Sequence, residues 1–417
     1  MPSPPIIDAA RVLPRLERLL TGVVVPYWFP DKIDPSGGFR LNHDNNGRWR
    51  GPGDKHLVTQ GRMTLAAARL VREGDELPAG IDLPTVRAAA DHGYAFLRDR
   101  FWDHEREGVY WSLAADGTPR RAEKHLLAQA TALGAFAEYA RATGSAEAAD
   151  MARRAFTQIE FAHDRHFGGY VELFGRDWSP IGPNAPRLIG TAPEMKVAGT
   201  HLHVLIALTH YMPIAEDGQV RERLIELILL MTTTILRQRH GFPTEPHTRN
   251  WRSVRDQSGH RASYGHIVEM AWWVPAAAIA VSLPPALVAG YSRALLDKVI
   301  DDALDRDAGG LFFEGPIDGP ADRLHKEWWV QVEALRAFAE WHRWTDDMRF
   351  ASTFLEILRW TEERQVDTTG GDFHGTIRPD GTAAGDKAGA WKCPYHQVVS
   401  LLGAIRMMYA NAPAFVV

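Results

Sequence analysis

The sequence predicts an all-α ring of twelve helices, arranged as six helix pairs with short β-hairpins at one end. A glycine-marked polar segment followed by an aromatic run recurs six times along the 417 residues, and two helical patterns separate successive copies. Units of this kind need neighbours to bury their apolar faces. Because one unpaired helix remains at each end of the chain, these two helices can pair and close the ring.

Each recurring segment is expected to form a short hairpin, because glycine supplies the turn and aromatic or β-branched residues supply the strand. The segments span 34–47, 104–117, 164–178, 239–251, 305–319 and 367–381. Their marker glycines are Gly38, Gly108, Gly169, Gly241, Gly310 and Gly371, which lie 61 to 72 residues apart. No linker or low-complexity run interrupts the series, which favours one domain over residues 1–417.

Helical patterns fill the intervals between the segments. The helices that directly follow a segment would form the inner wall, at about 54–73, 122–141, 190–211, 263–281, 326–342 and 392–410. Their outer partners are expected at about 8–22, 83–100, 146–163, 218–238, 287–303 and 346–362.

The composition excludes several classes of function. The chain is 45% hydrophobic and 24% charged, with a net charge of −5, so nothing indicates nucleic acid or an anionic membrane as a partner. The most apolar stretch, 274–290, is broken by prolines and is too short to span a bilayer. The single cysteine, Cys393, fits a reducing compartment, and without a signal-peptide pattern we expect a cytoplasmic protein.

Unusual polar and aromatic residues lie near the N-terminal ends of the six inner helices. One such residue on an apolar helix is usually structural, but six sets in register predict a functional site at the hairpin end. Helix N-termini there would also favour an oxyanion. The sets are Gln60 and Arg62; Lys124, His125 and Gln129; His201 and His203; His266 and Glu269; Trp328, Trp329, Gln331 and Glu333; and Trp391, Tyr395 and His396.

The spacing of the histidines narrows the chemistry. His266 and Glu269 are three residues apart on a helix and share a face, where the carboxylate could orient the imidazole for acid–base catalysis. A core histidine satisfied by a glutamate is the alternative. His201 and His203 are two apart, so at most one of them faces the cavity. A His-x-His pair on a helix does not readily chelate a metal, and no phosphate-binding glycine pattern occurs, so we expect neither a metal nor a cofactor.

Histidines, an arginine, a carboxylate and tryptophans at the mouth of a ring suggest a neutral sugar and proton transfer. Two histidines from different helices could flank C2 of an open-chain aldose. Removal of the C2 proton gives a cis-enediolate, whose charge Arg62 or an imidazolium could stabilise. Reprotonation on the other face of C2 is epimerisation, and reprotonation at C1 gives the ketose.

At these residues the sequence resembles the N-acylglucosamine 2-epimerase superfamily, which includes cellobiose 2-epimerases and mannose-type aldose–ketose isomerases. The matching motifs are SYGHIVE at 263–269, THLHVL at 200–205, EWWVQVE at 327–333, DKAGAWKCPYH at 386–396, FGGYVE at 167–172 and DW at 177–178. The similarity covers nearly the whole chain. It implies an (α/α)6 barrel and a cofactor-free isomerase that acts on a small sugar.

The resemblance also implies roles for single residues. His266 and His396 would move the C2 proton, and His203 would help to open the sugar ring. Glu269 would be the partner of His266. Trp391 and one of the adjacent pair Trp328 and Trp329 match tryptophans that line the sugar site. The expected substrate-binding residues are Arg62, Trp328, Trp329, Trp391 and Glu333.

The sequence departs from the cellobiose 2-epimerase pattern in three places. Gly199 replaces an asparagine, Ile206 replaces a glutamate, and residues 397–399 replace NGR. These changes concern substrate recognition and leave open cellobiose, another disaccharide or a hexose. A mannose-type isomerase, an inverting glycoside hydrolase using Glu269, Glu333 or Asp386, and a non-catalytic sugar-binding protein remain alternatives, and so do a monomer and a homodimer.

Overall fold

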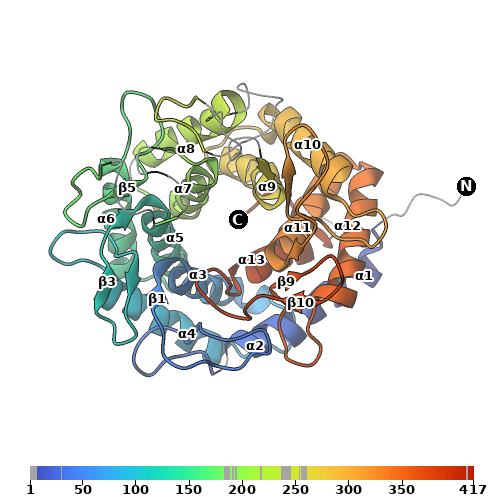
Figure 1. Ribbon diagram of the computed structural model, residues 1–417, viewed down its shortest axis with the longest axis horizontal. Coiled ribbons are helices and arrows are strands. Elements are labelled where there is room, and N and C mark those ends of the chain that lie inside the picture. The colour runs from blue at the N-terminus through green and yellow to red at the C-terminus, as the bar shows by residue number, and fades with distance from the viewer. Residues whose placement is uncertain are drawn as a thin grey trace, which may run out of the picture.

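The computed structural model describes residues 7–29, 31–182, 188–189, 192, 195–216, 218–235, 246–252, 254, 261–409 and 412–417. In this part of the chain, two concentric layers of helices surround one axis (Figure 1). The inner helices are α3 (Leu57–Glu73), α5 (Leu126–Thr143), α7 (Ala198–Tyr211), α9 (Tyr264–Ala280), α11 (Trp328–Thr345) and α13 (Tyr395–Met407). Each contacts the next, and α13 contacts α3, so the inner layer is a closed ring.

The outer layer covers each inner helix with a partner. The outer helices are α1 (Ala9–Arg18), α4 (Leu83–Phe96), α6 (Ala146–Phe161), α8 (Gln219–Leu229), α10 (Ala289–Lys298) and α12 (Met348–Trp360). Helix α1 packs on α13, which confirms that the unpaired first and last helices close the ring. The predicted (α/α)6 architecture is therefore confirmed.

Several boundaries differ from the expected ones. Helix α7 begins at Ala198, later than the expected 190, although four of the residues before it lie outside the described part. Five outer helices continue into a π-helical turn, at Leu19–Val24, Leu97–Phe101, Leu230–Ile235, Val299–Ala303 and Thr361–Gln365. Among the described residues, the remaining helical pieces are α2 (Val25–Trp28) and the 3-10 turns Gly74–Glu76, Met212–Ile214 and Pro285–Leu287.

The inner helices are buried around their whole circumference, because the outer layer covers one side and the ring encloses the other. In α9 the four consecutive residues Ala271, Trp272, Trp273 and Val274 are all at most 1% exposed. A helix that is apolar all round belongs in such a position. None of the described helices is both long and apolar enough to cross a membrane.

Short strands join neighbouring repeats at one end of the ring. The strand before each inner helix pairs with the loop of the next repeat, as Lys55 pairs with Leu113 and Lys326 with Ile377. A bridge between His43 and Ala388 joins the sixth repeat to the first. The strands are β1 (Lys55–His56), β2 (Ser112–Leu113), β3 (Pro119–Arg121), β4 (Lys124–His125), β5 (Leu173–Phe174), β6 (Arg261–Ser263), β7 (Glu314–Pro316), β8 (Lys326–Glu327), β9 (Thr376–Ile377) and β10 (Ala383–Ala384).

Each described segment begins with a tight loop that one bridge closes, and the strand that follows turns back as a short antiparallel hairpin. The predicted hairpins are therefore confirmed, for example where β2 pairs with β3 and β9 with β10. The closing bridges are Ile33–Phe39, Trp102–Val109, His163–Tyr170, Leu304–Leu311 and Val366–Phe373. Of the fourth segment, 239–251, the part up to 245 lies outside the described residues. Glycine is required in these loops: Gly108 has a φ of 71°, and a Cβ there would lie 2.8 Å from Gln129 Oε1.

A buried lysine clamps each described loop to the strand before its inner helix. In the fifth repeat, Lys326 Nζ donates to Asp305 Oδ2 at 2.7 Å and to the carbonyl of Gly309 at 2.5 Å. The four corresponding pairs are Lys55–Asp34, Lys124–Asp103, Lys196–Asp164 and Lys387–Asp367. The same contact, repeated at 2.7 to 3.1 Å, holds the loops around the ring.

Inner-helix amides bind the loop backbone next to these clamps. The side chain of Gln331 bonds both the N–H and the carbonyl of Leu311 at 2.8 Å. Gln60 does the same for Phe39, and Gln129 does so for Val109. The expectation that all six polar sets serve the functional site is therefore wrong for these glutamines, which satisfy loop backbone groups.

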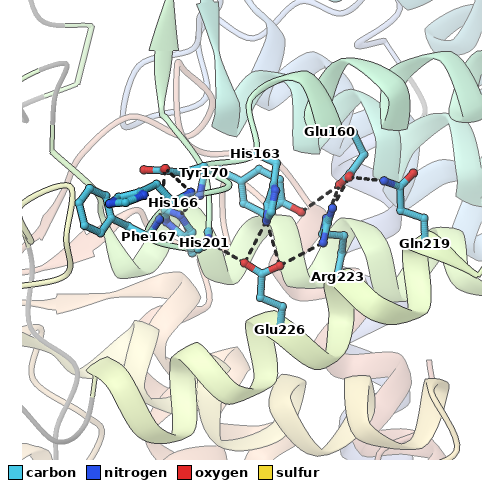
Figure 2. A network of polar contacts seen from close by, with 12 residues as sticks. Glu160, His163, His166, Phe167, Tyr170, His201, Gln219, Arg223 and Glu226 are labelled. Atoms are coloured by element: carbon cyan, nitrogen blue, oxygen red, sulfur yellow. Dashed lines mark hydrogen bonds and ion pairs between the residues drawn. The ribbon is translucent and has the colours of Figure 1, made fainter.

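The third loop has an additional anchor on the outer layer (Figure 2). Glu226 on α8 accepts from the backbone N–H of Gly169 at 2.8 Å, and one of its oxygens lies 2.9 Å from His163 Nε2. Arg223 bridges Glu226 to Glu160 on α6. This network joins α6, α8 and the loop, so it positions the segment that leads to α7.

We expect the clamps to be a main source of stability at the loop end. Lys55→Met should lower the free energy of unfolding by about 2–4 kcal/mol, because it leaves the Asp34 carboxylate part-buried without its cation. Urea denaturation measures the change. Arg87→Met is the matched control: its pair with Asp91 is exposed, so its loss should cost less than about 1 kcal/mol. Equal losses in the two variants would contradict the clamp.

Candidate active site

A cavity of about 480 Å3 opens inside the inner ring, at the end where the loops and strands gather. The N-terminal turns of the inner helices supply most of its wall, as the register of the sequence predicts. Its lining residues are Arg62, Leu127, Ile189, Val197, Gly199, Thr200, His203, His266, Glu269, Phe313, Glu327, Trp328, Trp329, Trp391 and His396.

The structure brings eight of the nine predicted site residues together in this cavity. They are Arg62, His203, His266, Glu269, Trp328, Trp329, Trp391 and His396. Trp328 and Trp329 both line the wall, although only one of them was expected to. The exception is Glu333, which lies behind the wall.

Five side chains from five helices form the floor of the site. Arg62 on α3 approaches His203 on α7, with 3.3 Å between Nη2 and Nε2. The rings of His203 and His266 are 6.3 Å apart and nearly perpendicular. Trp329 lies 5.4 Å from the His266 ring and 5.5 Å from the His396 ring. The two histidines that the resemblance assigns to proton transfer thus border one space.

Glu333 fixes the orientation of His396 and does not reach the cavity. One of its oxygens lies 2.7 Å from His396 Nδ1, and the other accepts from the indole N–H of Trp272 at 3.0 Å. The expectation that Glu333 binds the substrate is therefore not met. With Nδ1–H donating to a carboxylate, Nε2 of His396 is the free base that faces the cavity.

Glu269 does not pair with His266 as expected. Neither of its carboxylate oxygens has a hydrogen-bond partner among the described residues, and Oε1 lies 3.8 Å from His396 Nδ1. Burial and the neighbouring Glu333 carboxylate raise the pKa of Glu269 well above its usual range. Although His266 and Glu269 share a helix face, Glu333 lies on the neighbouring helix α11 and His396 on the next helix, α13, and the sequence alone cannot place them.

The electrostatics of the site favour neutral imidazoles. Burial, followed by the positive charge of Arg62, holds the pKa of both His203 and His396 well below the usual range. Burial raises the pKa of Glu333, while the Trp272 hydrogen bond and the charge of Arg336 oppose that rise. His203 and His396 are therefore unprotonated near neutral pH and can accept a proton.

One group of described residues has a geometry that could hold a metal ion. One oxygen each of Glu269 and Glu333 and a ring nitrogen of His396 lie within 4.8 Å of one another. The 2.7 Å contact between His396 Nδ1 and Glu333 already accounts for part of this closeness as a hydrogen bond. A metal ligated through Nδ1 would have to displace that proton.

His201 and two other predicted polar residues lie outside the cavity. His201 is fully buried and its Nε2 accepts from the N–H of Tyr170 at 2.9 Å, so His203 alone of the pair faces the site, as expected. Lys124 belongs to the loop clamp, and His125 caps its own helix by accepting from the N–H of Leu127.

Sequence reasoning missed much of the cavity wall. The missed residues are Leu127, Ile189, Val197, Thr200, Phe313 and Glu327. Glu327 carries the clearest signal, since it directly precedes the tryptophan pair. Its Oε1 accepts from Thr376 Oγ1 at 2.8 Å, and burial raises its pKa. The apolar residues lie among many other buried positions and give no comparable signal.

Comparison with known proteins agrees with this geometry. Residues 37–400 match the family model of N-acylglucosamine 2-epimerase (GlcNAc 2-epimerase). A cellobiose 2-epimerase of Bacteroides fragilis is 29% identical over 93% of this chain and 98% of its own, and one of Ruminococcus albus is 26% identical over 92% and 96%. The solved cellobiose 2-epimerase of Bacillus thermoamylovorans superposes with a TM-score of 0.84 at 26% identity, covering 95% of this chain and 99% of that one.

More distant matches include a D-mannose isomerase of Marinomonas mediterranea, 22% identical over 89% of this chain and 91% of its own. A family 76 glycoside hydrolase shares the fold alone, with a TM-score of 0.65 at 10% identity, covering 94% of this chain and 77% of that one. The relatives place the protein among carbohydrate epimerases and isomerases. Because the family model covers most of the chain, the protein belongs to the N-acylglucosamine 2-epimerase family.

Proposed function

We propose that the protein is a sugar 2-epimerase that inverts C2 of the reducing-end aldose in an unmodified disaccharide or hexose. The observation that carries the proposal is the pair His266 and His396, which reach one cavity from α9 and α13 and whose rings both lie within 5.5 Å of the Trp329 ring. Inversion through a planar intermediate is simplest when one group removes the proton and another returns it on the opposite face.

The proposed reaction uses side chains that line the cavity. His203, neutral and beside Arg62, assists proton transfer between the sugar oxygens as the ring opens. His396 Nε2 then takes the proton from C2, and the electrons of that C–H bond move toward C1 to give a cis-enediolate. Arg62 stabilises the oxyanion, because its positive charge lies on the cavity wall. It is next to His203, with 3.3 Å between Nη2 and Nε2. His266 delivers a proton to the other face of C2, and the ring closes. Proton exchange with water then removes the proton from His396 and replaces the one that His266 gave.

The shape of the cavity supports a disaccharide as well as a hexose. Trp391 lies at the mouth and is 46% exposed, which leaves an aromatic face for a second sugar ring. Gly199 lines the cavity without a side chain, so recognition at that point depends on the backbone and on neighbouring residues. Two relatives named above are cellobiose 2-epimerases, which favours a cellobiose-type substrate.

Aldose–ketose isomerisation is the second candidate, and the D-mannose isomerase relative favours it. The same enediolate gives the ketose when the proton returns to C1. An inverting glycoside hydrolase fits less well, because it needs two carboxylates that flank the scissile bond. Of the carboxylates predicted for this role, Glu333 is outside the cavity and Asp386 forms an exposed ion pair with Arg50. Glu269 and Glu327 do line the cavity, but Glu327 is already bonded by the hydroxyl of Thr376.

We also propose that residues 1–417 act as one domain in the cytoplasm, with a small sugar as the substrate and no nucleic-acid or membrane partner. The contact between α13 and α3 supports one domain, since it joins the last inner helix to the first. The single cysteine, Cys393, is buried, which is compatible with a reducing compartment.

Proton NMR in heavy water, without added metal or nucleotide, tests the activity. We expect loss of the C2 proton signal and a new epimer anomeric signal with at least one of cellobiose, glucose, mannose or N-acetylglucosamine. Ketose signals in excess of epimer would move the assignment to an isomerase. Sugar release from cellobiose without C2 exchange would contradict both.

The two-base mechanism predicts different losses from single variants. His266→Asn and His396→Asn should each lower epimer formation by about 10²–10⁴-fold. Each variant should still exchange the C2 proton of one epimer, the one whose C2–H faces the remaining histidine. His104→Asn, at an exposed loop position, is the matched control and should keep full activity. Inversion at the wild-type rate in either site variant would exclude the two-base assignment.

The loss of activity on the acidic side of the pH profile, called the acid limb below, should reflect protonation of Glu333. The carboxylate must be ionised to hold His396 Nδ1–H, and burial raises its pKa above the ordinary 4.5. Activity is therefore present above that raised pKa and is lost as the pH falls through it, about tenfold per unit. Measurement of kcat/KM against pH shows this loss. Glu327→Gln should lose activity over the same pH range as the wild type. If the loss disappears in this variant, Glu327 is the group that titrates.

A further inference from the structure

Arg336 lies directly behind the carboxylate that orients His396. It is on α11, three residues after Glu333, and its side chain is completely buried. Its guanidinium carbon lies 3.7 Å from the ring centre of Trp272. The indole N–H of Trp272 donates to Glu333, which in turn bonds His396. A continuous column of contacts thus runs from the barrel interior to the imidazole in the cavity.

Three groups fix the guanidinium in this place. Nε donates to Glu340 at 2.7 Å, Nη1 to the carbonyl of Val399 at 3.2 Å, and Nη2 to the carbonyl of Val416 at 3.1 Å. Val399 is on α13, three residues after His396. Gly403, one turn further, leaves the space, since a Cβ there would collide with Arg336 Nε. Arg336 therefore ties the helix of Glu333 to the helix of His396.

Residues 412–417 complete the anchor from the far end of the ring. Figure 1 shows the C-terminus close to the axis, surrounded by the inner helices. The N–H of Phe415 donates to Glu340 at 2.8 Å, and the Val416 carbonyl also accepts from Arg406. These contacts immobilise Glu340 and Arg336 together, so the guanidinium has one available position.

An arginine that served only to pair with Glu340 would not need to lie on the face of Trp272. A buried charge is expensive, and an apolar residue of similar size would fill the same space at a lower cost. Here the charge lies on the face of the tryptophan that donates to Glu333, where a cation strengthens an aromatic contact. The arrangement also supplies positive charge behind a carboxylate that burial would otherwise neutralise.

We infer that Arg336 is a positioning residue for His396: it holds Trp272 against Glu333 and places positive charge behind that carboxylate, and Glu340 with residues 412–417 holds Arg336. This role rests on the proposed function, in which His396 is the base. Other titratable groups also face the Glu333–His396 pair and contribute to its charge state. They are Arg62 on α3, His203 on α7, His266 and Glu269 on α9, and Tyr395 on α13.

The test compares Arg336→Met with Arg336→Lys. In Arg336→Met the acid limb of kcat/KM should move up by about one pH unit, which is about a tenfold loss at low pH. Arg336→Lys keeps the positive charge but lacks the planar guanidinium group, and its acid limb should shift less. A folded Arg336→Met protein with the wild-type limb and kcat would overturn the role.

Two further variants separate positioning from folding. Arg69→Met is the matched control, because Arg69 is 1% exposed on the inner helix α3 and pairs with Glu73 four residues on, as Arg336 pairs with Glu340. It should lower the melting temperature without moving the acid limb. Trp272→Phe keeps the aromatic ring but removes the donor, and it should move the limb in the same direction as Arg336→Met. An equal shift of the acid limb in Arg69→Met, or no shift in Trp272→Phe, would contradict the proposed chain of contacts from Arg336 to His396.

A readout without substrate separates this proposal from the proposed function. Nitrogen-15 NMR of the unliganded protein should show His396 protonated at Nδ1 and unprotonated at Nε2 near neutral pH. In Arg336→Met the pH at which this pattern is lost should rise. An unchanged titration in the folded variant would overturn the role of Arg336 whether or not any sugar reacts. Failure of wild-type C2 exchange would instead contradict the proposed function, and the NMR result would still decide for Arg336.

Discussion

A polar group on an inner helix is costly unless it finds a partner, because the outer layer and the closed ring bury these helices on all sides. An unpartnered polar group in such a place costs several kcal/mol. Near the helix N-termini, Gln60, Gln129 and Gln331 meet this requirement by bonding loop backbone. The residues that face the axis meet it with one another, or with a molecule in the cavity.

The loops and the site therefore depend on the same helix ends. Lysine clamps, and in three repeats glutamine amides, hold the described loops, and in two inner helices a residue in the same helical turn as a loop-binding residue lines the cavity. On α3, for example, Gln60 binds the first loop and Arg62 lines the site. On α7, His201 binds the third loop and His203 lines the site. Rigid loops thus give the catalytic side chains a fixed frame, which proton transfer requires.

Charge is distributed unevenly around the two imidazoles. Burial, followed by the charge of Arg62, keeps His203 and His396 unprotonated. Two carboxylates lie near His396, where Glu333 bonds it and Glu269 has a raised pKa. A neutral base beside a fixed cation suits a reaction that passes through an enediolate, because the base accepts the proton while the cation meets the new negative charge.

The repeat, the pairing of helices and the register of the site residues could be predicted from the sequence, because periodicity and turn glycines are local properties of the chain. So could the choice of His203 over His201, for which the family motif was needed as well as helix geometry. The partner of His396, the position of Glu269 and the role of Arg336 could not be predicted. Each depends on distances between helices that are far apart in sequence, and only the closure of the ring determines those distances.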